Sequence, residues 1–378
     1  MNARFVFFMA YKYFSSWRKQ SVIIVAAITG AVFLYVLTYS MLGGLVEATL
    51  SKTIGLAVPH VEVEVGMNDY EELKLALKNI GDVIAFSPRL ASQALISYDG
   101  KTKGVRVVEV YENLEPEVTE IDQYIVEGSW KLKDSCIVSK RLANELGVDL
   151  GDKVAIVLPS GEVVKVEVAE VFDTGVFELD AYVVYVSLDF LKEKLKGETE
   201  YLVALKLKNP SKSEEVAGEI GRLGFEARHW KELAKNVLDL IEVEEFYSTA
   251  LIASVLVITG LGIVNVMLML TESRKRSIGV LKAVGATSKE IFAVYFSVSL
   301  IYGILGFALG LSLALLIANA IKETSVEIFG GVLRVPFIFT PDLAFSGLAF
   351  ALVVSTLSCA YSAYKASTLD PAEVMRFE

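Results

Sequence analysis

Four uncharged, apolar stretches constrain this chain more than any other feature. They are residues 21–44, 248–271, 291–321 and 343–364, and none of them contains Asp, Glu, Lys, Arg or His. Each is long enough to cross the roughly 30 Å hydrocarbon core of a bilayer as a helix. The first is much longer than the apolar core of a signal peptide, about 7–15 residues, and lacks a small-residue cleavage site, so we expect it to remain as an anchor. The sequence therefore predicts a membrane protein with four transmembrane helices.

The basic residues are distributed unevenly around these stretches. Residues 1–20 contain four basic and no acidic residues, and residues 272–290 contain five basic and two acidic ones. Because short cytoplasmic flanks accumulate Lys and Arg, we expect both segments and both termini to lie in the cytoplasm of a multi-pass cell-membrane protein. Residues 45–247 hold 23 basic and 38 acidic residues, so the net charge of −10 comes from an external segment. A basic surface for nucleic acid is not expected.

The polar segment 45–230 has the pattern of an α+β domain inserted between the first and second transmembrane helices. Valines alternate with glutamates at 61–65, which predicts a strand with one buried face. Residues 69–80 carry apolar residues at helical spacing, with Asn68 or Asp69 as the N-cap. Both helices and strands are therefore expected in this domain.

Helical periodicity resumes towards the end of the external segment. A helix is predicted from Ser211, with Glu214 three residues later completing a capping box. After residue 230 the apolar spacing runs into the second span without Gly or Pro. We therefore expect one continuous helix whose external part, 231–247, is a stalk that ends at Phe246 and Tyr247 near the membrane interface. A stalk of this kind can transmit motion, or it can be a simple tether.

The chain accordingly divides into ten segments. We expect a cytoplasmic amphipathic N-terminal helix at 1–20, transmembrane helices at 21–44, 248–271, 291–321 and 343–364, an extracytoplasmic α+β domain at 45–230, a stalk helix at 231–247, a cytoplasmic helix and loop at 272–290, an external loop at 322–342 and a cytoplasmic tail at 365–378.

The chain offers few groups for catalysis or metal binding. Cys136 and Cys359 fall in the external domain and the last span, and the two histidines have neither clustered cysteines nor a nucleophile motif nearby in the sequence. The segment 100–102 is the nearest match to a phosphate-binding loop, but it does not fit the Walker A pattern, because Leu95 stands where that pattern needs glycine. No span holds an ionisable residue for proton coupling. We therefore expect no catalytic, cofactor-binding or metal-binding residues and no enzyme activity.

The segment 272–290 is unusual in combining an apolar stripe with clustered charge. Ile278, Leu281 and Val284 fall on one side of a short helix. The basic residues around them are Arg274, Lys275, Arg276 and Lys282. Two interpretations remain open: a basic helix that lies on anionic lipid, or a helix that docks in a groove of a cytoplasmic partner.

Turn and packing signals follow this helix. Gly285 suits the left-handed residue that ends a helix, and Thr287 with Glu290 forms a capping box that starts the third span. Within that span, Gly306 and Gly310 form a small-xxx-small pattern, which lets helix backbones approach closely. We therefore expect these two glycines to pack against another helix.

Several runs resemble a known family. The run Ile-Gly-Val-Leu-Lys-Ala-Val-Gly-Ala at 278–286 resembles the cytoplasmic signature of the MacB/FtsX-like (type VII) ABC transporter permeases. Two runs of the external domain, at 139–154 and 172–188, resemble the lipoprotein-releasing LolC/LolE branch of that family. One departure is Ser277, which stands where the family commonly has an acidic residue. A salt bridge of that acid therefore cannot be transferred to this chain.

The C-terminal run is similar to the closing run of the same family. Asp370 is an N-cap, Pro371 stands at the first helical position and Glu373 completes a capping box. These three residues predict a short helix at the end of the chain.

The resemblance implies a permease subunit without a cofactor of its own, which works with a separate ABC ATPase that binds ATP and Mg. Two ATPase copies would assemble with two permease chains, identical or different, in contact with membrane lipid. The resemblance further implies mechanotransmission, in which ATP hydrolysis moves the external domain to export or extract an amphiphile, peptide or lipoprotein, with or without an adaptor protein. The residues that it assigns to ATPase coupling are Glu272, Arg274, Arg276, Ile278, Leu281, Val284 and Gly285.

A second function remains open at the sequence level. The same assembly could move no substrate and instead activate an extracellular enzyme, as a transmembrane signalling subunit. A directly bound hydrolase, and transport that is unchanged when the chain is deleted, would favour this alternative.

Overall fold

The long apolar stretches form helices, and the polar segment between the first two forms a β-sheet. A computed structural model describes residues 3–16, 18–66, 69–132, 135–187, 200–321, 325–328, 331–334 and 337–368. The chain divides into two units that are described separately. The helical unit comprises Met1–Val46, Ile241–Ile328 and Val332–Glu378, and the sheet unit comprises Glu47–Leu240 and Phe329–Gly331.

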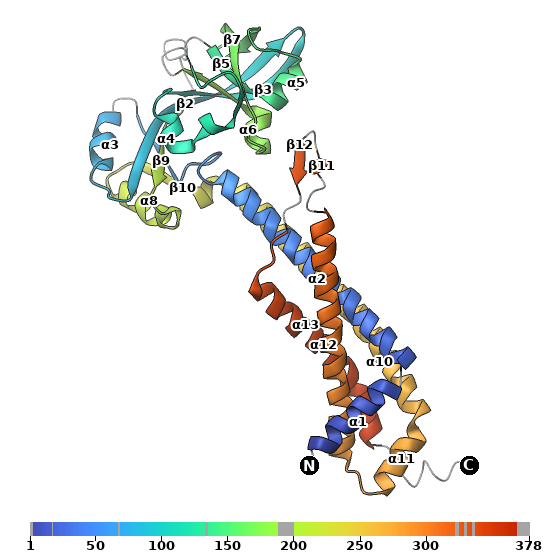
Figure 1. Ribbon diagram of the computed structural model, residues 1–378. Coiled ribbons are helices and arrows are strands. Elements are labelled where there is room, and N and C mark those ends of the chain that lie inside the picture. Colours follow the sequence, from blue (N-terminus) through green and yellow to red (C-terminus); the bar gives the residue numbers. More distant parts are fainter. Residues whose placement is uncertain are drawn as a thin grey trace. The chain divides into compact units, whose positions relative to one another are not determined.

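Among the described residues, four helices are long and apolar enough to cross a membrane, in agreement with the four predicted spans. They are α2 (Arg18–Thr53), α10 (Lys235–Ser273), α12 (Ser288–Ile321) and α13 (Pro341–Thr368), and all four appear in Figure 1. Two shorter helices, α1 (Ala3–Ser16) and α11 (Lys275–Ala283), precede α2 and follow α10. Since about 20 residues suffice to cross the hydrocarbon, α2 and α10 are much longer than a span requires.

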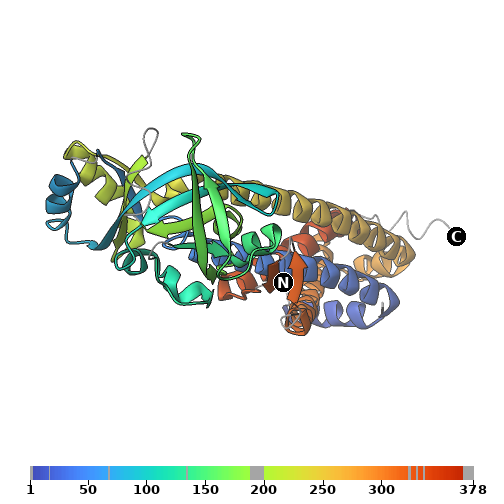
Figure 2. The same ribbon diagram turned by 90° about the horizontal axis from the view of Figure 1, so that it is seen from above.

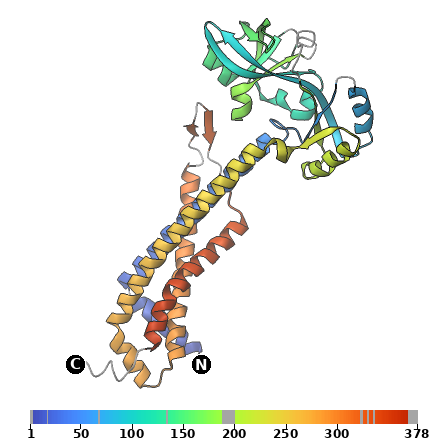
Figure 3. The ribbon, with the colours of Figure 1, turned by 180° about the vertical axis from the view of Figure 1, so that it is seen from behind.

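Helix α12 is central to the packing of the helical unit. It packs against α1 and α13, and its buried Tyr295 and Tyr302 belong to one apolar core with Ile28 and Val32 of α2. Helix α10 lies beside α2, where the hydroxyls of Tyr39 and Thr249 are 3.1 Å apart (Figures 1 and 3). The core of this unit therefore forms along the interfaces between long helices.

A two-stranded sheet lies within the predicted external loop 322–342. Its strands are β11 (Ser325–Ile328) and β12 (Gly331–Arg334). The predicted loop thus contains a pair of short strands.

The sheet unit is built around one mixed sheet. Along the sheet the strands follow the order β10-β1-β9-β2-β3-β8-β5-β7-β4, and β6 pairs with both β2 and β7. Their bounds are β1 Val61–Glu64, β2 Val83–Tyr98, β3 Lys101–Val110, β4 Ile125–Glu127, β5 Ser135–Ser139, β6 Lys153–Val157, β7 Val163–Phe172, β8 Val183–Ser187, β9 Glu200–Leu207 and β10 Glu226–His229. Most pairs are antiparallel, whereas β3–β8 and β5–β7 are parallel.

Short helices cover the faces of this sheet. They are α3 (Tyr70–Leu77), α4 (Glu115–Thr119), α5 (Lys140–Leu146), α6 (Phe177–Tyr182), α8 (Ser213–Arg222) and α9 (Trp230–Leu233), with single 3-10 turns η1 (Ile121–Tyr124) and η2 (Pro210–Lys212). Helices α3 and α8 lie towards one end of the unit, away from β5 and β7 (Figures 1 and 2).

Strand β2 joins two parts of the sheet unit, each with its own apolar core. Its first half pairs with β9, near the core between α3, α8, β1 and β9. Its second half pairs with β3 and β6, over a core that includes α5 and the inner faces of β5 to β8. Asp99 and Gly100, both at positive φ, make the tight turn between β2 and β3. Residues 100–102 thus lie at the end of this turn and the start of β3.

Some local predictions for the sheet unit are wrong. Glu62 is buried, 9% exposed, although it alternates with valines, because β1 lies between β9 and β10 and Arg228 donates a 3.1 Å hydrogen bond to its carboxylate. The capping box at Ser211 does not form. Instead, the Asn209 side chain accepts a hydrogen bond from the Ser211 backbone N–H, and α8 begins two residues later at Ser213.

Two helix predictions also need adjustment. The helix expected at 69–80 ends at Leu77, and Asp69 holds its N-cap position without a side-chain hydrogen bond, whereas Asn68 lies outside the described residues. The continuous helix expected after residue 230 begins at Lys235, because the single turn α9 ends at Leu233 and Ala234 separates it from α10.

Candidate functional site

Helix α11 lies between α10 and α12 in the chain, and a glycine turn followed by a capping box connects it to α12. Gly285 has φ +110°, a conformation that glycine adopts at little cost, and it turns the chain after α11. The Thr287 hydroxyl and the Glu290 backbone N–H are 3.3 Å apart, and the Glu290 carboxylate accepts a 3.0 Å bond from the Thr287 backbone N–H. The predicted capping box is therefore confirmed, and α12 starts at a defined point.

Ion pairs and hydrogen bonds connect α11 and its flanks to the other helix ends. Lys282 Nζ donates a 2.6 Å hydrogen bond to the Ser367 carbonyl near the end of α13. The Glu272 carboxylate lies 3.4 Å from Lys275 Nζ and 4.0 Å from Lys365 Nζ. These contacts join α11 and its flanks to the ends of α10 and α13.

The N-terminal helix is connected to the same region. Arg274 donates a weak 3.4 Å hydrogen bond to the Ser16 hydroxyl at the end of α1. Tyr13 and Phe14 of α1 pack against Tyr295 and Tyr302 of α12, with ring centroids 6.2 and 5.8 Å apart. One side of the helix expected to lie on the membrane surface thus packs on α12, while Phe7, Phe8 and Tyr11 on the other side stay exposed.

The apolar stripe predicted on α11 is divided by the fold. Ile278 is fully buried in the core of the helical unit, and Leu281 packs partly against that core. Val284, in contrast, is 83% exposed, and Val280 beside it is 47% exposed. The three residues predicted on one side of the helix are therefore not equally exposed: Ile278 and Leu281 pack on their own chain, and Val284 faces outwards.

The polar residues of this region fall on the outer side. Glu272, Arg274 and Arg276, which the resemblance assigns to ATPase coupling, are exposed, and so is Ser277. The outward-facing surface of this region therefore combines Val280 and Val284 with charged neighbours.

The two glycines singled out in the third span lie where α12 meets α2. A methyl group on Gly306 would lie 2.7 Å from Ile28 Cβ, and one on Gly310 would lie 2.8 Å from the Thr29 carbonyl oxygen. A side-chain carbon therefore does not fit at either position, and glycine, which has only a hydrogen there, lets α12 approach α2 closely. The C-terminal cap residues Asp370, Pro371 and Glu373 lie outside the described residues.

Sequence reasoning missed a set of buried hydroxyls behind α11. The hydroxyls of Ser21 and Tyr302 lie 2.9 Å apart, and Ser21 also donates to the Phe14 carbonyl at 3.2 Å. The Thr271 hydroxyl donates to the Met267 carbonyl at 2.9 Å and lies near Tyr295. Isolated Ser, Thr and Tyr residues in the apolar stretches are the only signal for this arrangement, and long-range pairing cannot be derived from them.

Both parts of the chain match protein-family models. Residues 21–223 match the MacB-like periplasmic core domain, and residues 249–371 match the FtsX-like permease C-terminal model. An uncharacterised ABC transporter permease of Methanocaldococcus jannaschii is 26% identical over 327 residues, which cover 82% of this chain and 79% of that protein.

Two further relatives have functional names. The lipoprotein-releasing system transmembrane protein LolC of Neisseria meningitidis serogroup B is 21% identical over 390 residues, which cover 94% of this chain and 93% of LolC. The macrolide export ATP-binding/permease protein MacB of Bdellovibrio bacteriovorus is 30% identical over 159 residues, which cover 38% of this chain and 23% of MacB. Since the MacB-like model alone spans more than half of the sequence, the chain belongs to the family of multi-pass ABC transporter permeases with a MacB-like periplasmic core domain and an FtsX-like C-terminal region.

Proposed function

We propose that this chain is the permease subunit of an ABC transporter whose ATPase is a separate polypeptide. ATP hydrolysis in the partner would move the sheet unit and thereby export or extract an amphiphile, a peptide or a lipoprotein. In this arrangement two ATPase subunits bind ATP and Mg and assemble with two permease chains. The termini and α11 lie in the cytoplasm, as the excess of basic residues in segments 1–20 and 272–290 favours.

The fixed position of α11 is the observation that carries this proposal. Its inner side is buried through Ile278, its flanks bond to α1 and α13, and its outer side exposes Val280 and Val284. A partner that binds the outer side therefore pushes on the whole helical unit. Apolar residues with basic neighbours also suit a groove on an ATPase with acidic edges.

The long helix α10 provides a path for this movement. It runs without interruption from Lys235 to Ser273, so a displacement at its α11 end is transmitted along its axis with little loss. The spans themselves contain no Asp, Glu, Lys, Arg or His, which favours a lever over a conduit for polar cargo.

The test is a pair of substitutions on the outer side of α11, Val280→Asp and Val284→Asp, assayed with the ATPase co-purified from membranes. A central apolar contact contributes about 2 kcal/mol to binding, so each substitution should weaken ATPase capture roughly 30-fold and abolish permease-stimulated ATP hydrolysis. Val163→Asp is the matched control, because Val163 is a 55% exposed valine on β7 of the sheet unit. Wild-type capture and stimulation in both α11 variants would rule out docking at this surface.

A further inference from the structure

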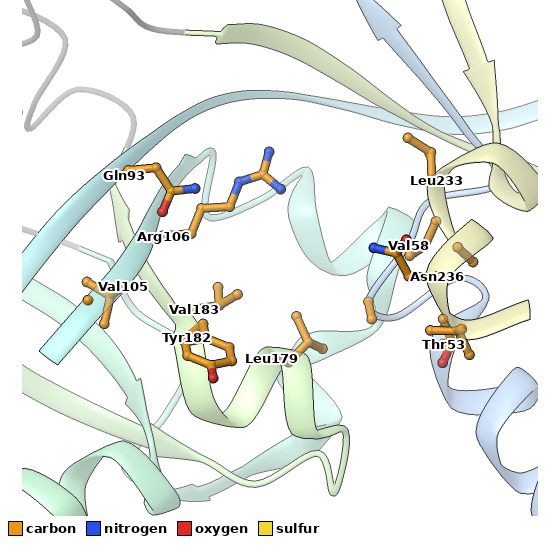
Figure 4. A pocket seen from close by; sticks show the side chains of 14 residues that line it. Thr53, Val58, Gln93, Val105, Arg106, Leu179, Tyr182, Val183, Leu233 and Asn236 are labelled. Carbon is orange, nitrogen blue, oxygen red and sulfur yellow. The ribbon is translucent and has the colours of Figure 1, made fainter. Parts of the chain in front are cut away.

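The sheet unit has a cavity of about 470 Å³ that is partly open to solvent and whose wall includes the start of α10. Figure 4 shows side chains from three parts of the chain around this space: Gln93 and Arg106 from β2 and β3, Leu179 and Tyr182 from α6, and Leu233 and Asn236 beside the α9–α10 junction. The volume falls within the range of about 300–1,000 Å³ that is typical of small-molecule sites.

The cavity wall is mainly apolar. Eight of its fourteen lining residues are Ala, Val or Leu, contributed by the sheet, by α6, by the segment after α2 and by the α9–α10 junction. A ligand that fills this space must therefore bury a hydrocarbon surface. A peptide fits less well, because its backbone N–H and C=O groups would meet few polar partners there, and unpaired polar groups are costly to bury.

Arg106 is the only charged group among the described residues that line the cavity. It is half-buried on β3, and in Figure 4 its guanidinium extends into the space between the sheet and the helices. Arg106 already interacts with another group of the chain, but a guanidinium has five N–H donors and can bind an anion in addition. The surrounding segment 45–247 has a net charge of −15, so a cationic side chain on an otherwise uncharged cavity wall favours an anionic ligand.

We propose that this cavity binds an anionic single-chain amphiphile, with the carboxylate at Arg106 and the acyl chain along Leu179, Val183 and Leu233. Gln93, which lies beside Arg106, offers a further hydrogen bond at the polar end. The acyl chain would contact both the sheet and the residues on either side of Ala234, where α9 ends and α10 begins. Whether such a ligand is transported or regulates transport depends on the proposed function. The binding of the ligand in this cavity does not depend on it.

Photolabelling of the full-length chain in detergent, without ATPase or ATP, tests the site. The probe is a palmitate analogue that carries a diazirine and an alkyne, and the labelled peptides are mapped by mass spectrometry. Labels are expected on peptides that contain residues 53–58, 179–183 and 233–237. Palmitate should compete for these labels roughly tenfold better than hexadecanol, because the alcohol lacks the charge that Arg106 binds.

Three variants locate the binding determinant. Arg106→Gln should weaken labelling at these peptides about tenfold or more, whereas Arg106→Lys should retain most of it. Leu233→Trp, which fills the cavity from the helix side, should weaken labelling without altering Arg106. The control is Arg222→Gln, because Arg222 is an exposed arginine on α8 outside the cavity.

Two results would overturn the proposal. One is labelling that is unchanged in both Arg106→Gln and Leu233→Trp, and the other is hexadecanol competing as well as palmitate. Neither bears on the proposed function, which is tested separately by ATPase capture at α11. A chain that captures the ATPase but fails to bind palmitate would therefore refute the amphiphile site alone.

Discussion

The close contact between α12 and α2 predicts that Gly310→Ala destabilises the helical unit. The added methyl group would lie 2.8 Å from the Thr29 carbonyl oxygen and 2.8 Å from Val32 Cβ. A backbone carbonyl in a helix cannot rotate away as a flexible side chain can. The helices must therefore separate by several tenths of an ångström along this contact.

Two opposing effects set the size of the change. Alanine favours a helix over glycine by about 1 kcal/mol, whereas overpacking a close contact costs about 1–3 kcal/mol. The net effect is a loss of about 0–2 kcal/mol in the free energy of unfolding. A variant with alanine at both Gly306 and Gly310 should roughly double this loss, since both residues face α2.

The measurement is reversible unfolding of the purified chain in mixed micelles with increasing SDS, followed by tryptophan fluorescence. Gly30→Ala and Gly262→Ala are the matched controls, because both glycines lie in long helices with no atom within 4 Å of the added methyl group. These controls should be as stable as the wild type or more so. If the double variant unfolds at the same SDS fraction as the controls, the close approach of α12 to α2 is refuted.

Three further predictions concern buried polar groups. The guanidinium of the buried Arg89 donates hydrogen bonds to both carboxylate oxygens of Glu115. Glu115→Gln removes the negative charge of this pair and should lower the free energy of unfolding by about 3–5 kcal/mol in chemical denaturation. A loss below about 1 kcal/mol would contradict the pairing. Burial raises the pKa of Glu170 from 4.5 to about 7. Between these two pH values the carboxyl group is protonated in the native state and ionised in the unfolded chain, so the free energy of unfolding should fall as the pH rises from about 4.5 to 7. Glu170→Gln should flatten this decline in thermal unfolding measured at several pH values, and an unchanged slope would show that another group causes it. Tyr302→Phe leaves the Ser21 hydroxyl without its 2.9 Å partner and should cost about 0.5–1.5 kcal/mol in the SDS assay, with no added cost in a Ser21→Ala background.

Apolar periodicity alone was sufficient to predict the membrane part of this fold. Uncharged stretches of this length have few stable alternatives, and local signals such as the Thr287–Glu290 capping box and the turn at Gly285 depend only on neighbouring residues. Features that depend on distant partners were not predictable. Glu62 alternates with valines like an exposed residue, yet it is buried because a third strand, β10, pairs with β1 from a part of the chain far away in sequence.

The candidate site shows the same limit. The composition of α11 predicted an apolar stripe, but Ile278 and Val284 look equivalent in the sequence, and only the packing of the long helices decides which one is buried. The cavity beside Arg106 was likewise beyond sequence reasoning. Its wall collects residues from β2, β3, α6 and α10, and nothing in the local pattern of any one element indicates the others.

The position of β1 in the sheet has a consequence for how the protein is made. Val61 pairs with Leu205 on one side and with His229 on the other, so β1 finds neither neighbour until nearly all of the sheet unit has been synthesised. Pairing of such distant segments is slow, and unpaired strand edges promote aggregation in the meantime. We expect newly made chains to remain sensitive to protease in this region until the residues that lead into α10 have emerged, and to depend on chaperones during that interval.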